Sequence, residues 1–177
     1  MFIQISKSVK ASWKKLVDSI KILGIDPGSV KTGYGLIESS GKRTKHLDSG
    51  FIKLNTKDSL SERLLVLSEE LGKLIEKFKP DCGAVEKIFY AKNAQSALTL
   101  GHARGVILLK LAEYKLPLNE YPPLKIKQTV VGVGRADKNQ VKHMVKILLN
   151  LQKILQEDEA DALAAAITSA HLRKWEY

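Results

Sequence analysis

The stretch ILGIDPGSVKTGYGLIE, residues 22–38, contains an apolar run that ends on a single carboxylate and a turn. The run from Ile22 to Ile25 is typical of a buried strand, and the proline and glycine after Asp26 break it, because proline fixes its own backbone and glycine tolerates positive φ. Glycines on both sides of Tyr34 in the next stretch indicate the close approach of another backbone or of a ligand. The segment alone fits a metal or phosphate site as well as it fits a β-hairpin whose aspartate opens a turn.

Composition narrows the class of protein. A chain of 177 residues is long enough for one domain with a good core, and no apolar run approaches the length of a membrane span, so we expect a soluble protein. Cys82 is the only cysteine, which excludes a disulfide framework and a cysteine-rich zinc site and indicates a cytoplasmic location. The net charge of +10 favours an anionic partner, with nucleic acid first, although many small basic proteins bind nothing specific.

The first twenty residues differ from the rest. Residues 1–20 place Val9, Trp13 and Leu16 on one helical stripe among lysines, and no signal-peptide pattern follows them. They fit a basic arm or a docked helix, but we favour a dispensable N-terminal extension. The functional domain is expected over residues 21–177.

The remaining pattern predicts an α/β domain. Three strand-like stretches, with a turn over Ser39–Arg43, precede an amphipathic helix that begins with a capping box from Ser59 to Glu62. A strand CGAVE, a helix over Asn93–Tyr114, a parallel strand PLNEY and two further helices, DKNQVKHMVKILL and DEADALAAAITSAHL, complete the series. The apolar residues of the helix over Asn93–Tyr114 exceed one face, which indicates a subunit contact as well as a core contact.

Four carboxylates are placed to converge. If the strand ending in Asp26 is central and the strand ending in Glu86 pairs with it in parallel, both side chains lie at the carboxyl ends of strands, where ligands gather in α/β sheets. Asp158 and Asp161, three residues apart, share one face of a helix start. Taken alone, acidic residues at a helix start are ordinary, because the helix dipole favours negative charge there.

Convergence of these carboxylates requires a compensating charge. Two carboxylates about 4 Å apart repel by about 4 kcal/mol at an effective dielectric constant near 20. Protonation or a bound cation relieves this repulsion, and an all-oxygen site favours Mg²⁺ or Mn²⁺ over zinc. Two such ions can activate water and stabilise the leaving oxygen of a phosphodiester, so the pattern together with the basic composition predicts a nuclease.

Four segments together resemble one family. ILGIDPGSVKTGYGLIE, AVEKIFYAKNAQSALTLGHARGVIL, IKQTVVGVGRADKNQVKHMV and DEADALAAAITSAH are similar to the bacterial RuvC family of Holliday junction resolvases, over about residues 21–171. The resemblance implies a ribonuclease H-like fold, which is a five-stranded mixed sheet flanked by helices. It also implies a homodimer that cuts two symmetric strands of four-way junction DNA, and a contact with the branch-migration proteins RuvA and RuvB.

The resemblance also assigns roles to single residues. It makes Asp26, Glu86, Asp158 and Asp161 the catalytic ligands of two Mg²⁺ ions, for which Mn²⁺ can substitute; some family members carry histidine at the third of these positions. It makes Lys127, Lys138 and Phe89 DNA-binding residues, with Phe89 stacking on bases at the crossover. Without the resemblance, both lysines read as solvated surface charge and Phe89 as a core aromatic.

Two other classes of protein share part of this pattern. DPGSVKTGYG is similar to the phosphate loop of actin-like ATPases and sugar kinases, but those proteins need a second lobe that 177 residues do not provide. A non-catalytic junction-binding module has no need of four convergent carboxylates, so metal-dependent cleavage distinguishes it from a nuclease.

Overall fold

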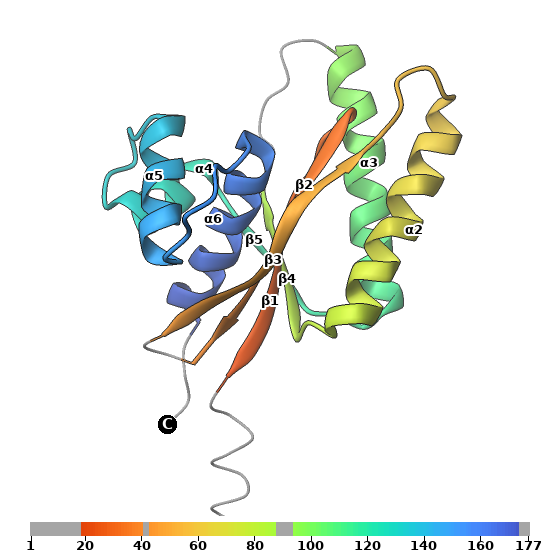
Figure 1. Cartoon of the computed structure of the whole chain (residues 1–177). Helices are drawn as coiled ribbons and strands as arrows, with labels where there is room; N and C mark the ends of the chain where they lie inside the picture. The colour runs from red at the N-terminus through yellow and green to blue at the C-terminus, as the bar shows by residue number, and fades with distance from the viewer. Residues whose placement is uncertain (1–18, 41–42, 88–93, 174–177) are drawn as a thin grey trace, which may run out of the picture.

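One mixed sheet organises the chain. The computed structural model describes residues 19–40, 43–87 and 94–173. Strands β1 to β3 form an antiparallel meander, and β4 and β5 run parallel to β1, in the order β3-β2-β1-β4-β5 (Figure 1). The strands are β1 (Ile20–Asp26), β2 (Lys31–Ser39), β3 (Thr44–Lys53), β4 (Cys82–Glu86) and β5 (Leu118–Tyr121). The predicted five-stranded mixed sheet is therefore confirmed. β1 begins at Ile20, one residue inside the segment expected to be an extension.

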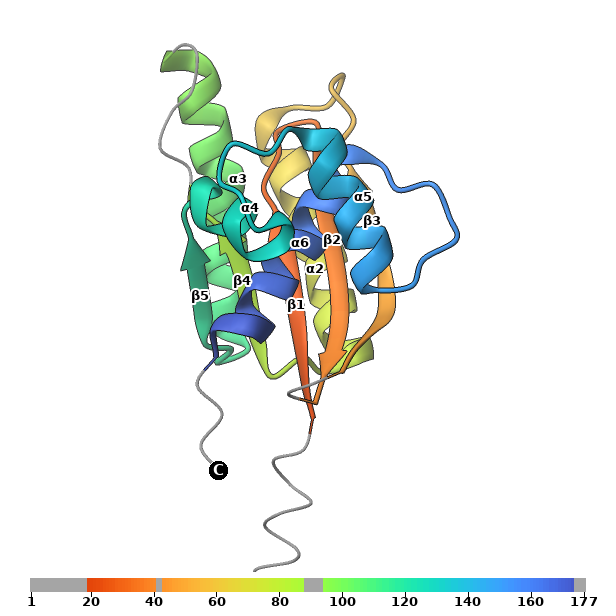
Figure 2. The ribbon, with the colours of Figure 1, turned by 90° about the vertical axis from the view of Figure 1, so that its left-hand side faces the viewer.

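Helices cover both faces of the sheet. Figures 1 and 2 show α2 and α3 on one face and α4, α5 and α6 on the other. Alternate residues of β1 serve the two layers: Leu23 and Ile25 pack in the cluster under α2 and α3, whereas Ile22 packs in the cluster under α6. The helices are α2 (Leu60–Phe78), α3 (Ala94–Glu113), α4 (Pro123–Val131), α5 (Lys138–Leu148) and α6 (Glu157–Leu172).

Helix α6 lies directly on glycines of the two central strands. A Cβ on Gly24 would overlap the carbonyl oxygen of Ala162, and a Cβ on Gly35 would overlap Leu163. Almost the whole of α6 after its first turn is buried as a result. The expectation that the glycines flanking Tyr34 mark a close backbone approach is confirmed for Gly35, and the backbone that approaches is that of α6; Gly24 makes the same kind of contact.

The helix ends follow the predicted capping signals. The Ser59 hydroxyl accepts a hydrogen bond from the Glu62 backbone N–H, and the Glu62 carboxylate accepts one from the Ser59 backbone N–H. α2 ends at Lys79, which adopts the left-handed conformation (φ 50°) just before Pro80. Helix α4 was not predicted as a separate element, although proline at its first position suits a helix start, where the missing N–H is not needed.

Helix α3 buries little of its apolar surface within the described chain. Its buried residues are Ala103, Ile107 and Leu111, while the side chains of Leu98 and Leu109 are both about 60% exposed. This pattern agrees with the expectation of a second contact surface on α3. None of the described helices is long and apolar enough to cross a membrane.

Candidate active site

Strand register brings the first two carboxylates together. Ile25 pairs with Val85 in the parallel β1–β4 ladder, so Asp26 and Glu86, the next residue of each strand, end the two strands side by side. Both side chains face the α6 layer, because residues two apart along a strand point to the same face and Gly24 contacts α6. The predicted adjacency of Asp26 and Glu86 is confirmed.

The start of α6 brings the other two carboxylates over the same strand end. Gly33 is the cross-strand partner of Asp26, and a Cβ on Gly33 would overlap the backbone carbonyl of Asp158. The first turn of α6 therefore rests on the Asp26–Gly33 pair. Asp161, one turn further along, faces the same space as Asp158, as the spacing of three residues predicts.

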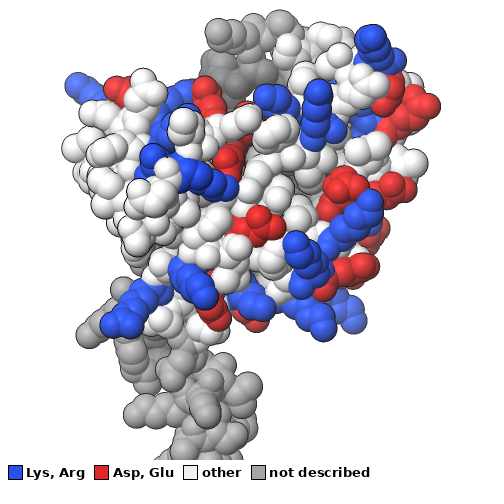
Figure 3. Space-filling model, viewed as in Figure 1, with Lys and Arg blue, Asp and Glu red and all other residues white. Residues whose placement is uncertain are grey.

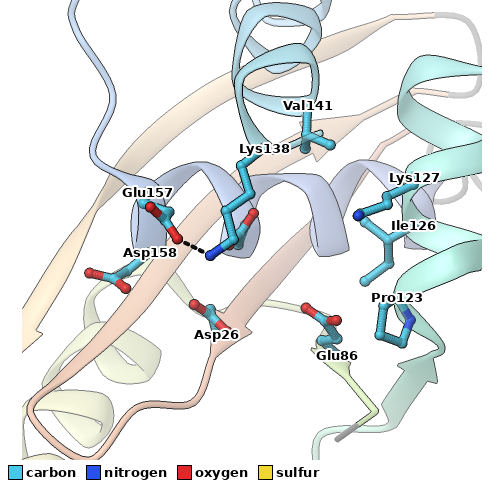
Figure 4. A pocket seen from close by; sticks show the side chains of 10 residues that line it. Asp26, Glu86, Pro123, Ile126, Lys127, Lys138, Val141, Glu157 and Asp158 are labelled. Atoms are coloured by element: carbon cyan, nitrogen blue, oxygen red, sulfur yellow. Dashed lines mark hydrogen bonds and ion pairs between the residues drawn. The ribbon is translucent and has the colours of Figure 1, made fainter. Parts of the chain in front are cut away.

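A cavity of about 340 Å³ lies between these elements (Figure 4). Asp26 and Glu86 enter it from strand ends, Lys138 from the start of α5, and Lys127 from α4. The full lining is Asp26, Glu86, Pro123, Ile126, Lys127, Lys138, Val141, Glu157, Asp158 and Asp161. All four carboxylates and both lysines expected at the site thus share one cavity.

The carboxylates disfavour one another's charge. Burial, reinforced by the charges of Asp161, Glu86 and Asp158, raises the pKa of Asp26 to about 8. Burial and the charge of Asp161 raise the pKa of Glu86, and burial is also the main cause of a raised pKa at Asp161. The cavity therefore favours a cation, or protons in place of one.

The donor set fits a hard divalent cation. Among the described residues, five carboxylates line the cavity, the fifth being that of Glu157, and no sulfur or imidazole does; oxygen ligands of this kind suit Mg²⁺ or Mn²⁺. Within residues 19–40, 43–87 and 94–173, no three side chains of His, Cys, Asp or Glu already stand close enough to form a metal-binding group.

Lys138 is one of two lysines among the described residues that line the cavity. Its ammonium group forms an ion pair with Glu157 at the first position of α6, and Figure 4 shows its side chain reaching from α5 toward the carboxylates. The hydrogen bond to Glu157, aided by the charges of Glu157, Asp161 and Asp26, raises the pKa of Lys138 despite partial burial. The pKa of Glu86 is raised overall, but the charges of Lys127 and Lys138 act against that rise. Both lysines therefore lie close enough to interact with the strand-end carboxylates.

Two further contacts hold the strand ends. The Arg104 guanidinium of α3 donates a hydrogen bond of 3.1 Å to the backbone carbonyl of Glu86 and forms an ion pair with Glu120 of β5. The turn after Asp26 is closed by the Thr32 hydroxyl, which donates to the Gly28 carbonyl at 3.1 Å. Phe89, expected to contact DNA, lies outside the described residues.

Sequence reasoning missed two acidic residues beside the cavity. Glu157 was not recognised as the partner of Lys138, and nothing in a single sequence indicates that pairing. Glu159 was also missed: its carboxylate accepts a hydrogen bond from the Gln156 backbone N–H, which is the reciprocal half of a capping box, but no serine or threonine stands at the N-cap to signal it in the sequence.

Comparison with known proteins identifies relatives over nearly the whole described chain. The family model of crossover junction endodeoxyribonuclease RuvC matches residues 22–169. The crossover junction endodeoxyribonuclease RuvC of Syntrophotalea carbinolica is 53% identical over 152 residues, covering 86% of this chain and 94% of that protein. That of Citrifermentans bemidjiense is 50% identical over 150 residues, covering 85% and 92%.

Solved structures agree with this assignment. Thermus thermophilus RuvC in complex with a Holliday junction substrate superposes with a TM-score of 0.82 at 30% identity, covering 86% of this chain and 93% of that one. The yeast mitochondrial Holliday junction resolvase, 18% identical, shares the fold with a TM-score of 0.61, covering 89% and 84%. The predicted ribonuclease H-like α/β fold is confirmed.

Proposed function

The chain belongs to the RuvC family of crossover junction endodeoxyribonucleases, and we propose that the carboxylate cavity is where it cuts four-way DNA junctions. Resolution of Holliday junctions follows from close homology to this family. The observation that carries the assignment of the cavity is the meeting of four carboxylates from β1, β4 and α6 in one space.

Asp26, Glu86, Asp158 and Asp161 would hold two Mg²⁺ ions, with Mn²⁺ as a substitute. The raised pKa of Asp26, caused by burial and then by the neighbouring carboxylates, supports this, because bound divalent ions relieve the charge that burial disfavours. The ions would supply an activated water and a stabilised leaving oxygen for hydrolysis of a phosphodiester. The carboxylates fix where these ions bind, and the strand ends limit how far the ligands can move.

Lys138 and Lys127 would bind the phosphates that flank the scissile bond. Lys138 pairs with Glu157 and lines the cavity together with the carboxylates, so its ammonium group is already positioned there before DNA arrives. The remaining basic residues do not indicate a single DNA-binding surface. Figure 3 shows Lys and Arg distributed over much of one face, and they are not gathered in one patch. Phe89 stays a proposed stacking residue at the crossover.

Paired, symmetric cutting requires two active sites, so we propose a homodimer. The exposed leucines of α3, Leu98 and Leu109, support a subunit contact on that helix. The described part of the chain has no membrane-spanning helix, and a cytoplasmic location with contacts to RuvA and RuvB belongs to the same proposal.

One experiment tests the function directly. A labelled four-way junction and a linear duplex of the same sequence are incubated with the protein in Mg²⁺ or in EDTA. Symmetric nicks in the junction alone, in Mg²⁺ alone, are expected. Cleavage of both substrates, or cleavage in EDTA, would contradict the proposal.

A further inference from the structure

A polar network centred on the buried residues Glu159 and Ser49 joins the start of α6 to β3, outside the carboxylate cavity. Glu159 is only 5% exposed although it follows Asp158 directly. Its Oε1 accepts a hydrogen bond of 2.7 Å from the Ser49 hydroxyl of β3 and one of 2.5 Å from Lys153 Nζ. Its Oε2 accepts a hydrogen bond of 3.2 Å from the Gln156 backbone N–H. Both oxygens of this buried carboxylate are therefore paired.

Ser49 is the centre of the network, and its hydrogen bonds are complete. The hydroxyl gives its one hydrogen to Glu159, and it accepts from Lys153 Nζ at 3.0 Å. His46 Nε2 lies 2.6 Å from the same oxygen and must donate to it, because the serine hydrogen is already used. Lys153 also donates to the Ser49 carbonyl at 3.4 Å, so the loop before α6 is tied to β3 by side chain and by backbone.

The charged state of Glu159 is held by these contacts. Burial alone would raise its pKa, but hydrogen bonds from Lys153, Ser49 and the Gln156 backbone outweigh burial and lower it. The hydrogen bond from the Gln156 backbone does not by itself require Glu159 to be buried. Here the same side chain also joins α6 to a strand two positions away from β1 in the sheet.

We propose that Glu159, Ser49 and Lys153 form a positioning network that holds the first turn of α6 so that Asp158 and Asp161 meet Asp26 and Glu86. The network acts on the side of α6 away from the cavity, and the Asp158 carbonyl rests on Gly33. Two supports on different strands thus fix the helix start in place. Residues that orient metal ligands without touching the metal change metal affinity or activity by about 10- to 100-fold when they are mutated. The inference rests on the proposed metal-binding role of the cavity.

The test uses Glu159→Gln and Ser49→Ala in the full-length protein. Glutamine keeps the volume and the capping bond but loses the charge that pairs with Lys153. Glu70→Gln is the matched control, because it removes the same charge from an exposed pair with Lys73 on α2. Mg²⁺ binding is measured by calorimetry on the protein alone, and single-turnover junction cleavage is measured against Mg²⁺ concentration.

Both network variants are expected to need at least about 10-fold more Mg²⁺ for half-maximal binding and cleavage, with unchanged junction affinity in EDTA. Glu70→Gln should match the parent. A purely structural role predicts something else: fewer folded molecules, but a parental Mg²⁺ midpoint in those that fold. A parental midpoint in Ser49→Ala and Glu159→Gln overturns the inference.

Asp26→Asn, measured in parallel, separates this inference from the proposed function. An inactive Asp26→Asn beside network variants with parental midpoints refutes only the positioning role. An Asp26→Asn variant that binds Mg²⁺ and cuts like the parent refutes the metal site itself, and with it the inference.

Discussion

Asp26 and Glu86 belong to strands, whereas Asp158 and Asp161 belong to the start of a helix, and the two pairs are held in the cavity in different ways. The strand pair is placed by the β1–β4 register, which backbone hydrogen bonds define. The helix pair is placed by side-chain contacts and by a glycine that lets the backbones touch. Strand register is set by backbone, so it tolerates side-chain substitution better than the helix start does.

The comparison predicts which substitutions lower the cleavage rate without weakening junction binding. Asp26→Asn, Glu86→Gln and Asp161→Asn should each lower the cleavage rate by more than about 100-fold, since loss of an outer partner alone costs 10- to 100-fold. Junction binding should stay equal or become tighter, because each change removes negative charge. Gel-shift assays in EDTA and cleavage assays in Mg²⁺ measure the two effects separately.

Asp158→Asn should cost less than the other three substitutions. This expectation rests on the family resemblance, which implies that the position of Asp158 accepts histidine as another ligand type. The prediction that Asp26 and Glu86 matter more than Asp158 would be wrong if Asp26→Asn or Glu86→Gln cut junctions at a near-parental rate while Asp158→Asn did not.

Gly33→Ala tests how the start of α6, which carries Asp158 and Asp161, is positioned on β2. A methyl group at Gly33 would overlap the Asp158 carbonyl, so α6 must shift, at a cost of about 1–3 kcal/mol in the free energy of unfolding. Cleavage should fall further than the loss of folded protein explains, because the shift moves Asp158 away from Asp26. Thermal unfolding and cleavage of the same sample measure both.

Gly101→Ala is the control for Gly33→Ala. A Cβ at Gly101, an exposed position of α3, would meet nothing within 4 Å, so alanine should stabilise the helix by about 0.5–1 kcal/mol. Equal and small effects of both substitutions would show that the contact between Gly33 and α6 does not position the site.

The raised pKa of Asp26 predicts a smaller, pH-dependent effect. The folded protein holds a proton on Asp26 up to about pH 8, whereas the unfolded chain loses it near the ordinary pKa of 3.8. Between these values the folded state binds more protons, so the Asp26 contribution makes unfolding easier as pH rises. In EDTA, Asp26→Asn should therefore melt at a higher temperature than the parent, by a margin that widens toward pH 8.

Added Mg²⁺ should reverse that order. The ion stabilises the parent, whose ligands are complete, more than it stabilises Asp26→Asn. Melting curves of both proteins from about pH 5 to pH 8, with EDTA or Mg²⁺, give the measurement. A margin that shrinks as pH rises would contradict the raised pKa.

The strand pair, Asp26 and Glu86, was easier to predict from the sequence than the side-chain contacts around the site. Asp26 and Glu86 each end an apolar run, and residues of that kind at strand ends converge in any parallel pair, so both were predictable from local pattern. The Ser49–Glu159 contact joins residues 110 positions apart. No local period encodes such a pairing, and the same holds for Lys138 with Glu157. Helix α4 was missed because two prolines end the preceding strand and obscure the short helix that the second proline begins.

Deletion of residues 1–18 is expected to have the smallest effect, because β1 is anchored by later residues. Ile20 pairs with Ser39, and the Lys21 backbone N–H donates to the Asp81 carboxylate at 2.7 Å, so the strand that carries Asp26 keeps its own hydrogen bonds.

The deletion removes four lysines and one aspartate and lowers the net charge from +10 to +7. Folding and the cleavage rate at saturating protein should stay within a few-fold of the parent. Junction affinity should fall modestly, and the slope of log affinity against log salt concentration should become smaller by at most about 4, because four lysines are lost. Filter binding over a salt series measures the slope, and cleavage at saturation measures the rate. A truncated protein that does not fold, or that folds but does not cut, would show that the strand half depends on residues before Ser19.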